Sequence, residues 1–245
     1  MIGVPNFRGF VRTFVFICVG VFVLEVFARN NPEGGDFFNQ IIRFFGIVPE
    51  LFFRGMVYQV VTWVFFHGDT LHLLLNMLAF WMFGSLLQDY FGEKKFILFC
   101  LIAAVGSGLI VASVGLLSAA SSGVATIGAS GVVFAILIAI SRLFPDQVVL
   151  FMFIFPMKMR TFAYLLIAME FFALWQANKN NPVSNIAHLG GAVIGWIYIS
   201  FFGSPGGRSS NSGDWWKNLK DKWRQRRMRK RLRVVRSNET QQRWN

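Results

Sequence analysis

A serine between glycines is the first candidate for chemistry in this sequence. Gly128-Ala129-Ser130-Gly131 stands at the start of an apolar run, 132–144, that is hydrophobic enough to lie inside a bilayer. About sixty residues later, His188 begins another apolar segment, and Gly191 and Gly195 follow it on the same helical face. A nucleophile and a base that are both held at membrane depth predict hydrolysis inside the lipid bilayer.

The position of Ser130 favours a chemical role over a structural one. Serines are common in membrane helices, where the hydroxyl bonds to a carbonyl one turn earlier, and that alternative has to be weighed. Here, however, the flanking glycines allow close backbone approach, and the helix N-terminus offers free N–H groups and a dipole that stabilise an oxyanion. In addition, Gly131, Ala135 and Ala139 form a ridge of small residues that permits close approach of another helix.

His188 is the predicted partner of the serine. A lone histidine in an apolar setting is usually a structural hydrogen bonder. The glycine groove that follows His188 nevertheless matches the ridge after Ser130, and pressing the two faces together brings hydroxyl and imidazole into hydrogen-bonding range. Neither helix carries a nearby acid that could orient the imidazole, so we expect a dyad rather than a triad.

His72 and Asn76 form a third polar element. They are four residues apart and project from one helical face, where they could donate hydrogen bonds to an oxyanion beside the Ser130 N–H. An interhelical polar clamp explains the spacing equally well. A zinc site made of His67, His72 and His188 is disfavoured, because no carboxylate or cysteine stands at ligand spacing. We expect no metal and no cofactor.

The composition is that of a membrane protein. Apolar residues make up 55% of the 245 residues and charged residues 15%, and 29 phenylalanines and 8 tryptophans suit a lipid-facing surface with interfacial rings. Most of the net charge of +12 lies after residue 203, where thirteen Lys/Arg face three acids. The nearly neutral body argues against a nucleic-acid partner, and Cys18 and Cys100 match neither a metal site nor a disulfide framework.

Six apolar segments are long enough, or nearly so, for a membrane span of about 20 residues. They are residues 10–28, 71–91, 95–118, 127–144, 160–177 and 184–203. The connection 29–70 is broken by Pro49, Gly55 and scattered charges, and we expect short interfacial helices there. Residues 147–155 are apolar but too short to span. The expected fold is therefore an all-α polytopic bundle of six helices in residues 1–203.

The distribution of Lys and Arg predicts the orientation of the chain. The N-terminal segment resembles a signal sequence but lacks a clean cleavage site, so we expect it to be kept as the first span. With the N-terminus in the cytoplasm, that side also receives the residues Arg8, Arg12, Lys94, Lys95, Arg142, Lys158, Arg160 and the basic tail. The other side receives Arg29, Arg43, Arg54 and Lys179.

The tail, residues 204–245, allows two interpretations. Trp215, Trp216, Leu219 and Trp223 share one helical face among basic residues, which is typical of an amphipathic helix on anionic lipid headgroups. The alternative is a solvated basic tail that only secures the topology.

Three blocks of the chain together resemble the signature of the rhomboid family of intramembrane serine proteases. They are Gly128-Ala129-Ser130-Gly131, Ala187-His188-Leu189-Gly190-Gly191 with Gly195, and His67 followed by His72-Leu-Leu-Leu-Asn76. The blocks occur in the family's order, and the resemblance covers about residues 5–203. It implies a six-helix core, typical of a bacterial inner membrane, that cleaves transmembrane proteins.

The resemblance also implies roles for single residues. Ser130 and His188 would be the catalytic dyad, and the Ser130 N–H, His72 and Asn76 would form the oxyanion hole. Phe134 stands where the family usually carries a tyrosine that packs on the imidazole. The chain departs from the family at Tyr58-Gln59, where Trp-Arg is frequent, and at Gln88, where glutamate is frequent.

Two rival functions remain. A catalytically silent relative that binds transmembrane clients generally lacks the serine or the histidine, whereas this chain has both. A transporter with Ser130 and His188 in a polar pathway predicts inverted repeats, and the sequence shows none.

Overall fold

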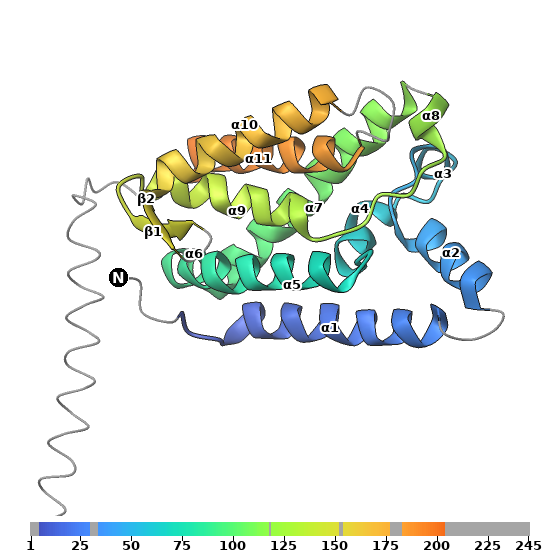
Figure 1. The fold of residues 1–245 in the computed structure, drawn as a ribbon, viewed down its shortest axis with the longest axis horizontal. Helices are drawn as coiled ribbons and strands as arrows, with labels where there is room; N and C mark the ends of the chain where they lie inside the picture. Colours follow the sequence, from blue (N-terminus) through green and yellow to red (C-terminus); the bar gives the residue numbers. More distant parts are fainter. Residues whose placement is uncertain (1–4, 30–33, 118, 152–153, 177–182, 204–245) are drawn as a thin grey trace, which may run out of the picture. The chain divides into compact units, whose positions relative to one another are not determined.

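The structure is a computed structural model that describes residues 5–29, 34–117, 119–151, 154–176 and 183–203. The two interpretations of the tail concern residues outside these ranges. The described part is a bundle of helices (Figure 1).

Six helical segments occupy the six predicted spans. They are α1 (Gly9–Arg29), the α5–η2–α6 segment (Thr70–Ala79, Phe80–Gly84, Ser85–Phe91), α7 (Glu93–Leu116), α9 (Ser130–Leu143), α10 (Met159–Gln176) and α11 (Val183–Phe202). Among the described residues, four segments are long and apolar enough to cross a membrane: Gly9–Arg29, Thr70–Phe91, Glu93–Leu116 and Ser184–Phe202. The α9 helix is apolar but has 14 residues, fewer than a straight crossing needs. The chain is therefore a mostly helical, multi-pass membrane protein, and the count of six spans stays a prediction.

Short elements fill the connections between the long helices. The first long connection contains α2 (Gly34–Phe45), α3 (Pro49–Phe53), α4 (Gln59–Thr62) and the 3-10 turn η1 (Trp63–Phe65), as expected for residues 29–70, and α8 (Ala119–Ser122) follows α7. The expectation of an all-α fold is wrong at one place. Strands β1 (Val148–Phe151) and β2 (Phe155–Lys158) form an antiparallel hairpin. This apolar run, rich in valine and phenylalanine, is too short to span and suits strands instead.

The α9 helix lies at the centre of the bundle, against α11 and α7 (Figure 1). Nearly every residue from Gly131 to Ile140 is buried, so α9 is covered on all its faces. The outer helix α1 differs, because large apolar side chains such as Phe16, Leu24 and Phe27 are 63–70% exposed. An apolar surface of this kind suits contact with lipid.

Gln59 anchors the first long connection. Its side chain is fully buried; Oε1 accepts from the Val48 N–H at 3.1 Å, and Nε2 donates to the carbonyl oxygens of Arg43 (3.0 Å) and Phe44 (3.1 Å). One amide thus satisfies three backbone groups from the end of α2 to the start of α3. Gln59 belongs to the Tyr58-Gln59 pair that stands where the family frequently carries Trp-Arg. In this chain the glutamine thus has a defined structural role.

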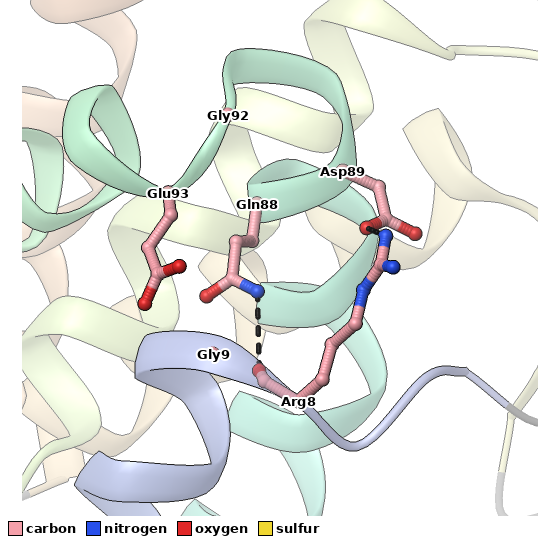
Figure 2. A pocket seen from close by; sticks show the side chains of 6 residues that line it. All are labelled: Arg8, Gly9, Gln88, Asp89, Gly92 and Glu93. Carbon is pink, nitrogen blue, oxygen red and sulfur yellow. Dashed lines mark hydrogen bonds and ion pairs between the residues drawn. The ribbon is translucent and has the colours of Figure 1, made fainter.

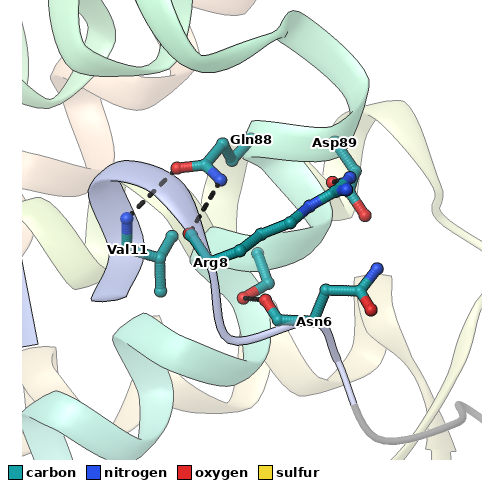
Figure 3. A network of polar contacts seen from close by, with 6 residues as sticks. Asn6, Arg8, Val11, Gln88 and Asp89 are labelled. Carbon is teal, nitrogen blue, oxygen red and sulfur yellow. Dashed lines mark hydrogen bonds and ion pairs between the residues drawn. The ribbon is translucent and has the colours of Figure 1, made fainter. Parts of the chain in front are cut away.

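Gln88 plays a similar part at the start of α1. Its Oε1 accepts from the Val11 N–H at 3.1 Å, and its Nε2 donates to the Arg8 carbonyl oxygen at 3.1 Å (Figure 3). The Arg8 guanidinium pairs with Asp89 at 2.7 Å beside it. These residues line one wall of a small polar pocket between α1 and the α6–α7 junction, together with Gly9, Gly92 and Glu93 (Figure 2). The amide therefore fixes the first helix against the second.

The described charges that are predicted to share one side of the membrane belong to elements at one end of the bundle. The start of α1, the α6–α7 junction and the β-hairpin gather there, and α2, α3 and α8 lie at the opposite end (Figure 1). Within the hairpin end, Asp146 pairs with Lys158 at 3.2 Å and with Arg160. The elements that carry these charges thus lie together, as the distribution of Lys and Arg predicts. The assignment of this end to the cytoplasm stays a prediction.

Candidate active site

The start of α9 is built around Gly128. Its φ of +124° lies in a region that other residues rarely adopt, and its N–H donates to the Trp63 carbonyl oxygen at 3.0 Å. A Cβ on Gly128 would lie 2.7 Å from His72 Nε2 and 3.7 Å from Ser130 Oγ. Glycine therefore lets the chain turn sharply into the helix and leaves room for the histidine. Ser130 is the first residue of α9, where N–H groups have no partner within the helix.

The Ser130 hydroxyl and the His188 imidazole meet. Ser130 Oγ and His188 Nε2 are 2.7 Å apart, and both side chains are partly buried. At this distance the hydroxyl donates when Nε2 carries no proton, which is the arrangement that activates a serine nucleophile. The buried Ser107 shows the alternative role of a membrane serine, since its hydroxyl donates to the Ala103 carbonyl oxygen one turn earlier at 2.6 Å.

Glycines bring the two helices together. A Cβ on Gly191 would overlap the carbonyl oxygen of Gly131, and a Cβ on Gly195 would overlap that of Ala135. The ridge on α9 and the groove on α11 are therefore in direct backbone contact at two successive turns. This contact places the first turn of α9 opposite the turn of α11 that carries His188.

Phe134 lies one turn below the serine. Its ring stacks on the His188 imidazole with centroids 4.7 Å apart and planes 4° from parallel. The stack covers one face of the imidazole and limits the rotation of the ring. It therefore helps to keep Nε2 directed at Ser130.

His72, on α5, lies beside the Gly128 turn that leads into α9. Asp69 begins this helix by accepting the His72 backbone N–H at 2.9 Å, which fixes the turn. The Gly68 N–H lies 3.4 Å from His72 Nδ1 and donates to it, so that Nε2 carries the ring proton and points towards Gly128. Asn76 is buried, and its Nδ2 donates to the His72 carbonyl oxygen at 2.9 Å. The second amide hydrogen of Asn76 is left for another acceptor.

His67 stands behind His72. Its side chain is fully buried, and its ring meets that of His72 edge to face at 5.2 Å. Burial, followed by repulsion from His72, lowers the pKa of His67 to about 4, so the ring is neutral at pH 7. Arg29 donates to the Gly68 carbonyl oxygen at 2.8 Å and ties this loop to the end of α1.

Neither α9 nor α11 carries an acid, as expected, but a third helix brings one close to the imidazole. Glu170 Oε1 lies 2.9 Å from His188 Nδ1, on the side of the ring away from Ser130, and the carboxylate comes from α10. The spacing of Ser130 and His188 points only to their own two helices, so it does not predict an acid from a third helix. A sequence signal did exist, since Glu170 is the single acid within the apolar segment Met159–Gln176.

The chain is similar to several known proteins. A family model described as the rhomboid domain matches residues 54–205. Rhomboid protein 1, mitochondrial, of Saccharomyces cerevisiae is 29% identical over 57% of this chain and 40% of its own length. Rhomboid protease GlpG of Haemophilus influenzae is 27% identical over 58% of this chain and 68% of its length. Rhomboid protease GluP of Bacillus subtilis is 24% identical over 79% of this chain and 35% of its length. The matched regions thus span from 35% to 68% of the length of these relatives.

Proposed function

The chain belongs to the rhomboid family, and from this premise we propose that it is an intramembrane serine protease that hydrolyses peptide bonds in or near transmembrane segments of membrane proteins. The observation that carries the proposal is the 2.7 Å contact between Ser130 Oγ and His188 Nε2 at the buried start of α9. A hydroxyl with a base in contact and unpaired backbone N–H groups beside it has the parts that acyl transfer needs.

In the proposed mechanism, His188 Nε2 takes the hydroxyl proton as Ser130 Oγ attacks the substrate carbonyl carbon. The oxyanion that forms is stabilised by the Ser130 N–H, by His72 Nε2–H and by the second N–H of Asn76. The imidazolium then gives its proton to the leaving amine, the C–N bond breaks, and an acyl-enzyme remains. A water molecule then gives a proton to His188 and attacks the ester carbon; the imidazolium returns that proton to Ser130 Oγ as the C–O bond breaks and the carboxylic acid product leaves. No step calls for a metal, so we expect activity to persist in chelator.

The substrate follows from the location of the site. A closed helix hides its carbonyl groups in backbone hydrogen bonds, so a transmembrane substrate has to unwind locally before it is cut. We propose that the substrate helix approaches sideways between spans and that water reaches Ser130 from the outer face. The short α9, which begins at the serine, leaves depth above the site for such water.

We place the protein in a cell membrane with six spans, both termini in the cytoplasm and residues 204–245 as a basic tail that contacts anionic headgroups. The charge distribution supports this orientation. Because relatives of similar identity come from bacteria and from mitochondria, the bacterial inner membrane is part of the proposal.

The test is cleavage of a transmembrane reporter by the full-length protein in liposomes. Wild type should cleave with and without chelator, and Ser130→Ala and His188→Ala should be inactive while they keep the wild-type unfolding temperature. Lys158→Gln, at the hairpin end, is the matched control and should cleave like wild type. Cleavage by Ser130→Ala at the wild-type rate would refute the proposal, and wild type that binds the reporter without cleaving it would favour a silent client-binding relative.

A further inference from the structure

A partly buried chain of polar contacts continues from the proposed dyad into α10. Glu170 Oε1 lies 2.9 Å from His188 Nδ1, and Glu170 Oε2 accepts from Asn185 Nδ2 at 2.7 Å. The side chains of Glu170 and His188 are 16% and 21% exposed. A carboxylate within an apolar helix costs several kcal/mol to insert unless it is compensated, and here two polar partners from α11 face it.

The two nitrogens of His188 therefore face different kinds of partner. Nε2 faces a hydroxyl that can donate, and Nδ1 faces a carboxylate that can only accept. The Glu170 oxygen lies near Nδ1 but off the direction of its N–H bond, so the two groups make a close polar contact rather than an aligned hydrogen bond. Among the described residues, His72 on α5 also interacts electrostatically with the imidazole.

We propose, on the premise of the protease function, that Glu170 is a positioning residue for His188. Its carboxylate favours the tautomer with the proton on Nδ1, which leaves Nε2 free to accept the proton of Ser130. When that proton has moved to Nε2, the ring is positively charged and the carboxylate stabilises it. Glu170 stays deprotonated throughout, and the transferred proton leaves with the amine. Asn185 holds the carboxylate in place by donating to its other oxygen.

The competing explanation is that Glu170 and Asn185 only fasten α10 to α11. Glu170→Gln separates the two explanations because it keeps the size of the side chain and its hydrogen bond with Asn185. With the Asn185 amide in its present orientation, its NH₂ still donates, so the oxygen of the introduced glutamine faces it and the glutamine NH₂ faces His188 Nδ1. This arrangement forces the proton to Nε2, which is the tautomer that cannot accept from Ser130. A purely fastening role predicts no change in kcat.

A second substitution should reverse the effect. In Glu170→Gln/Asn185→Asp, residue 185 becomes the acceptor, so the glutamine turns its NH₂ towards it and its oxygen towards His188 Nδ1. The proton returns to Nδ1, and the pair keeps one negative charge near the ring. The double variant therefore restores the tautomer with the proton on Nδ1. A role that only fastens α10 to α11 does not predict this recovery.

The experiment measures kcat and KM for reporter cleavage by full-length protein in liposomes, together with the histidine tautomers from nitrogen NMR shifts. The chain has 3 histidines, so the His188 signal is assigned by substitution. We expect Glu170→Gln to lower kcat about 100-fold with KM unchanged. This is less than the ~10⁴-fold loss when an aligned triad aspartate is replaced, because the contact here is off axis. The double variant should recover about tenfold, and the control Glu50→Gln, in an exposed pair with Arg54, should match wild type.

The results separate this inference from the function it rests on. A wild-type kcat in Glu170→Gln, or a His188 tautomer that the substitution leaves unchanged, overturns the positioning role while Ser130-dependent cleavage upholds the protease. Absence of Ser130-dependent cleavage in wild type overturns the protease, and the tautomer measurement still reports on the Glu170 contact. If Glu170→Gln does not fold, the double variant decides: proton on Nδ1 supports the role, and proton on Nε2 overturns it.

Discussion

Replacing Gly195 by alanine should disable the site from two helical turns away. A Cβ at this position would overlap the Ala135 carbonyl oxygen and lie 2.7 Å from the Ala135 Cα, where ordinary contact begins at 3.4 Å. Both neighbours are backbone atoms of α9, so no side chain can turn aside. The two helices must therefore separate by at least about 0.7 Å, the difference between these two distances, and overpacking of this kind costs about 1–3 kcal/mol.

The same displacement reaches the reacting atoms. The Ser130 Oγ to His188 Nε2 distance of 2.7 Å would grow to about 3.4 Å if the helices move as rigid bodies, and a hydrogen bond at that length is weak. Misplacement by about 1 Å costs on the order of 100-fold in rate. We therefore expect Gly195→Ala to lower kcat for reporter cleavage by about 100-fold and to lower the unfolding temperature moderately.

Two other glycines serve as matched controls. A Cβ on Gly20, inside α1, meets nothing within 4 Å, so Gly20→Ala should keep full activity and gain about 0.5–1 kcal/mol of helix stability. A Cβ on Gly190 meets the Ile110 side chain at 3.3 Å, which can yield, so Gly190→Ala should lose less than about tenfold, or 1.4 kcal/mol. Wild-type kcat in Gly195→Ala would refute the reasoning that backbone contact between α9 and α11 sets the geometry of the site.

Three further outcomes can be measured. Phe134→Leu removes the ring that stacks on His188 and should lower kcat about two- to tenfold, since aromatic pairs contribute about 0.5–1.5 kcal/mol; unchanged kcat would show that the stack does not orient the imidazole. Gln59→Leu leaves three backbone groups without partners and should lower the free energy of unfolding by about 1–3 kcal/mol in a denaturant titration; equal stability would contradict the anchoring role. Stability should fall as the pH drops from 6.5 to about 4, because unfolded His67 binds a proton there and the folded form resists it. The loss should approach roughly 3 kcal/mol and flatten below pH 4, and a His67→Phe variant with the same slope would exclude this residue as its source.

Sequence reasoning reached the parts of the site that depend on local pattern. Ser130 and His188 were found from their types and from glycines at helical spacing, and that spacing also indicated which helix faces meet. Segment 29–70 was predicted as short helices because prolines, glycines and charges interrupt it. These features can be predicted from the sequence because each depends on residues within one or two helical turns of one another.

The rest depended on contacts between distant segments. Glu170 is adjacent to the imidazole only because α10 packs beside α11, and no spacing on either helix encodes that neighbour. Gln59 and Gln88 were identified as departures from the family, but the backbone groups they satisfy belong to other elements. The hairpin at residues 148–158 was missed because an apolar run of that length fits a strand or a buried helix equally well.

Whether Ser130 and His188 form a reactive pair can be tested by mapping the covalent adduct of a fluorophosphonate probe on the full-length protein in native membranes. We predict one adduct, on the peptide that contains Ser130, and its loss in His188→Ala, because the hydroxyl reacts only with the imidazole beside it. An adduct at another serine, or undiminished labelling of Ser130 in His188→Ala, would contradict the assignment of these two side chains as the reactive pair.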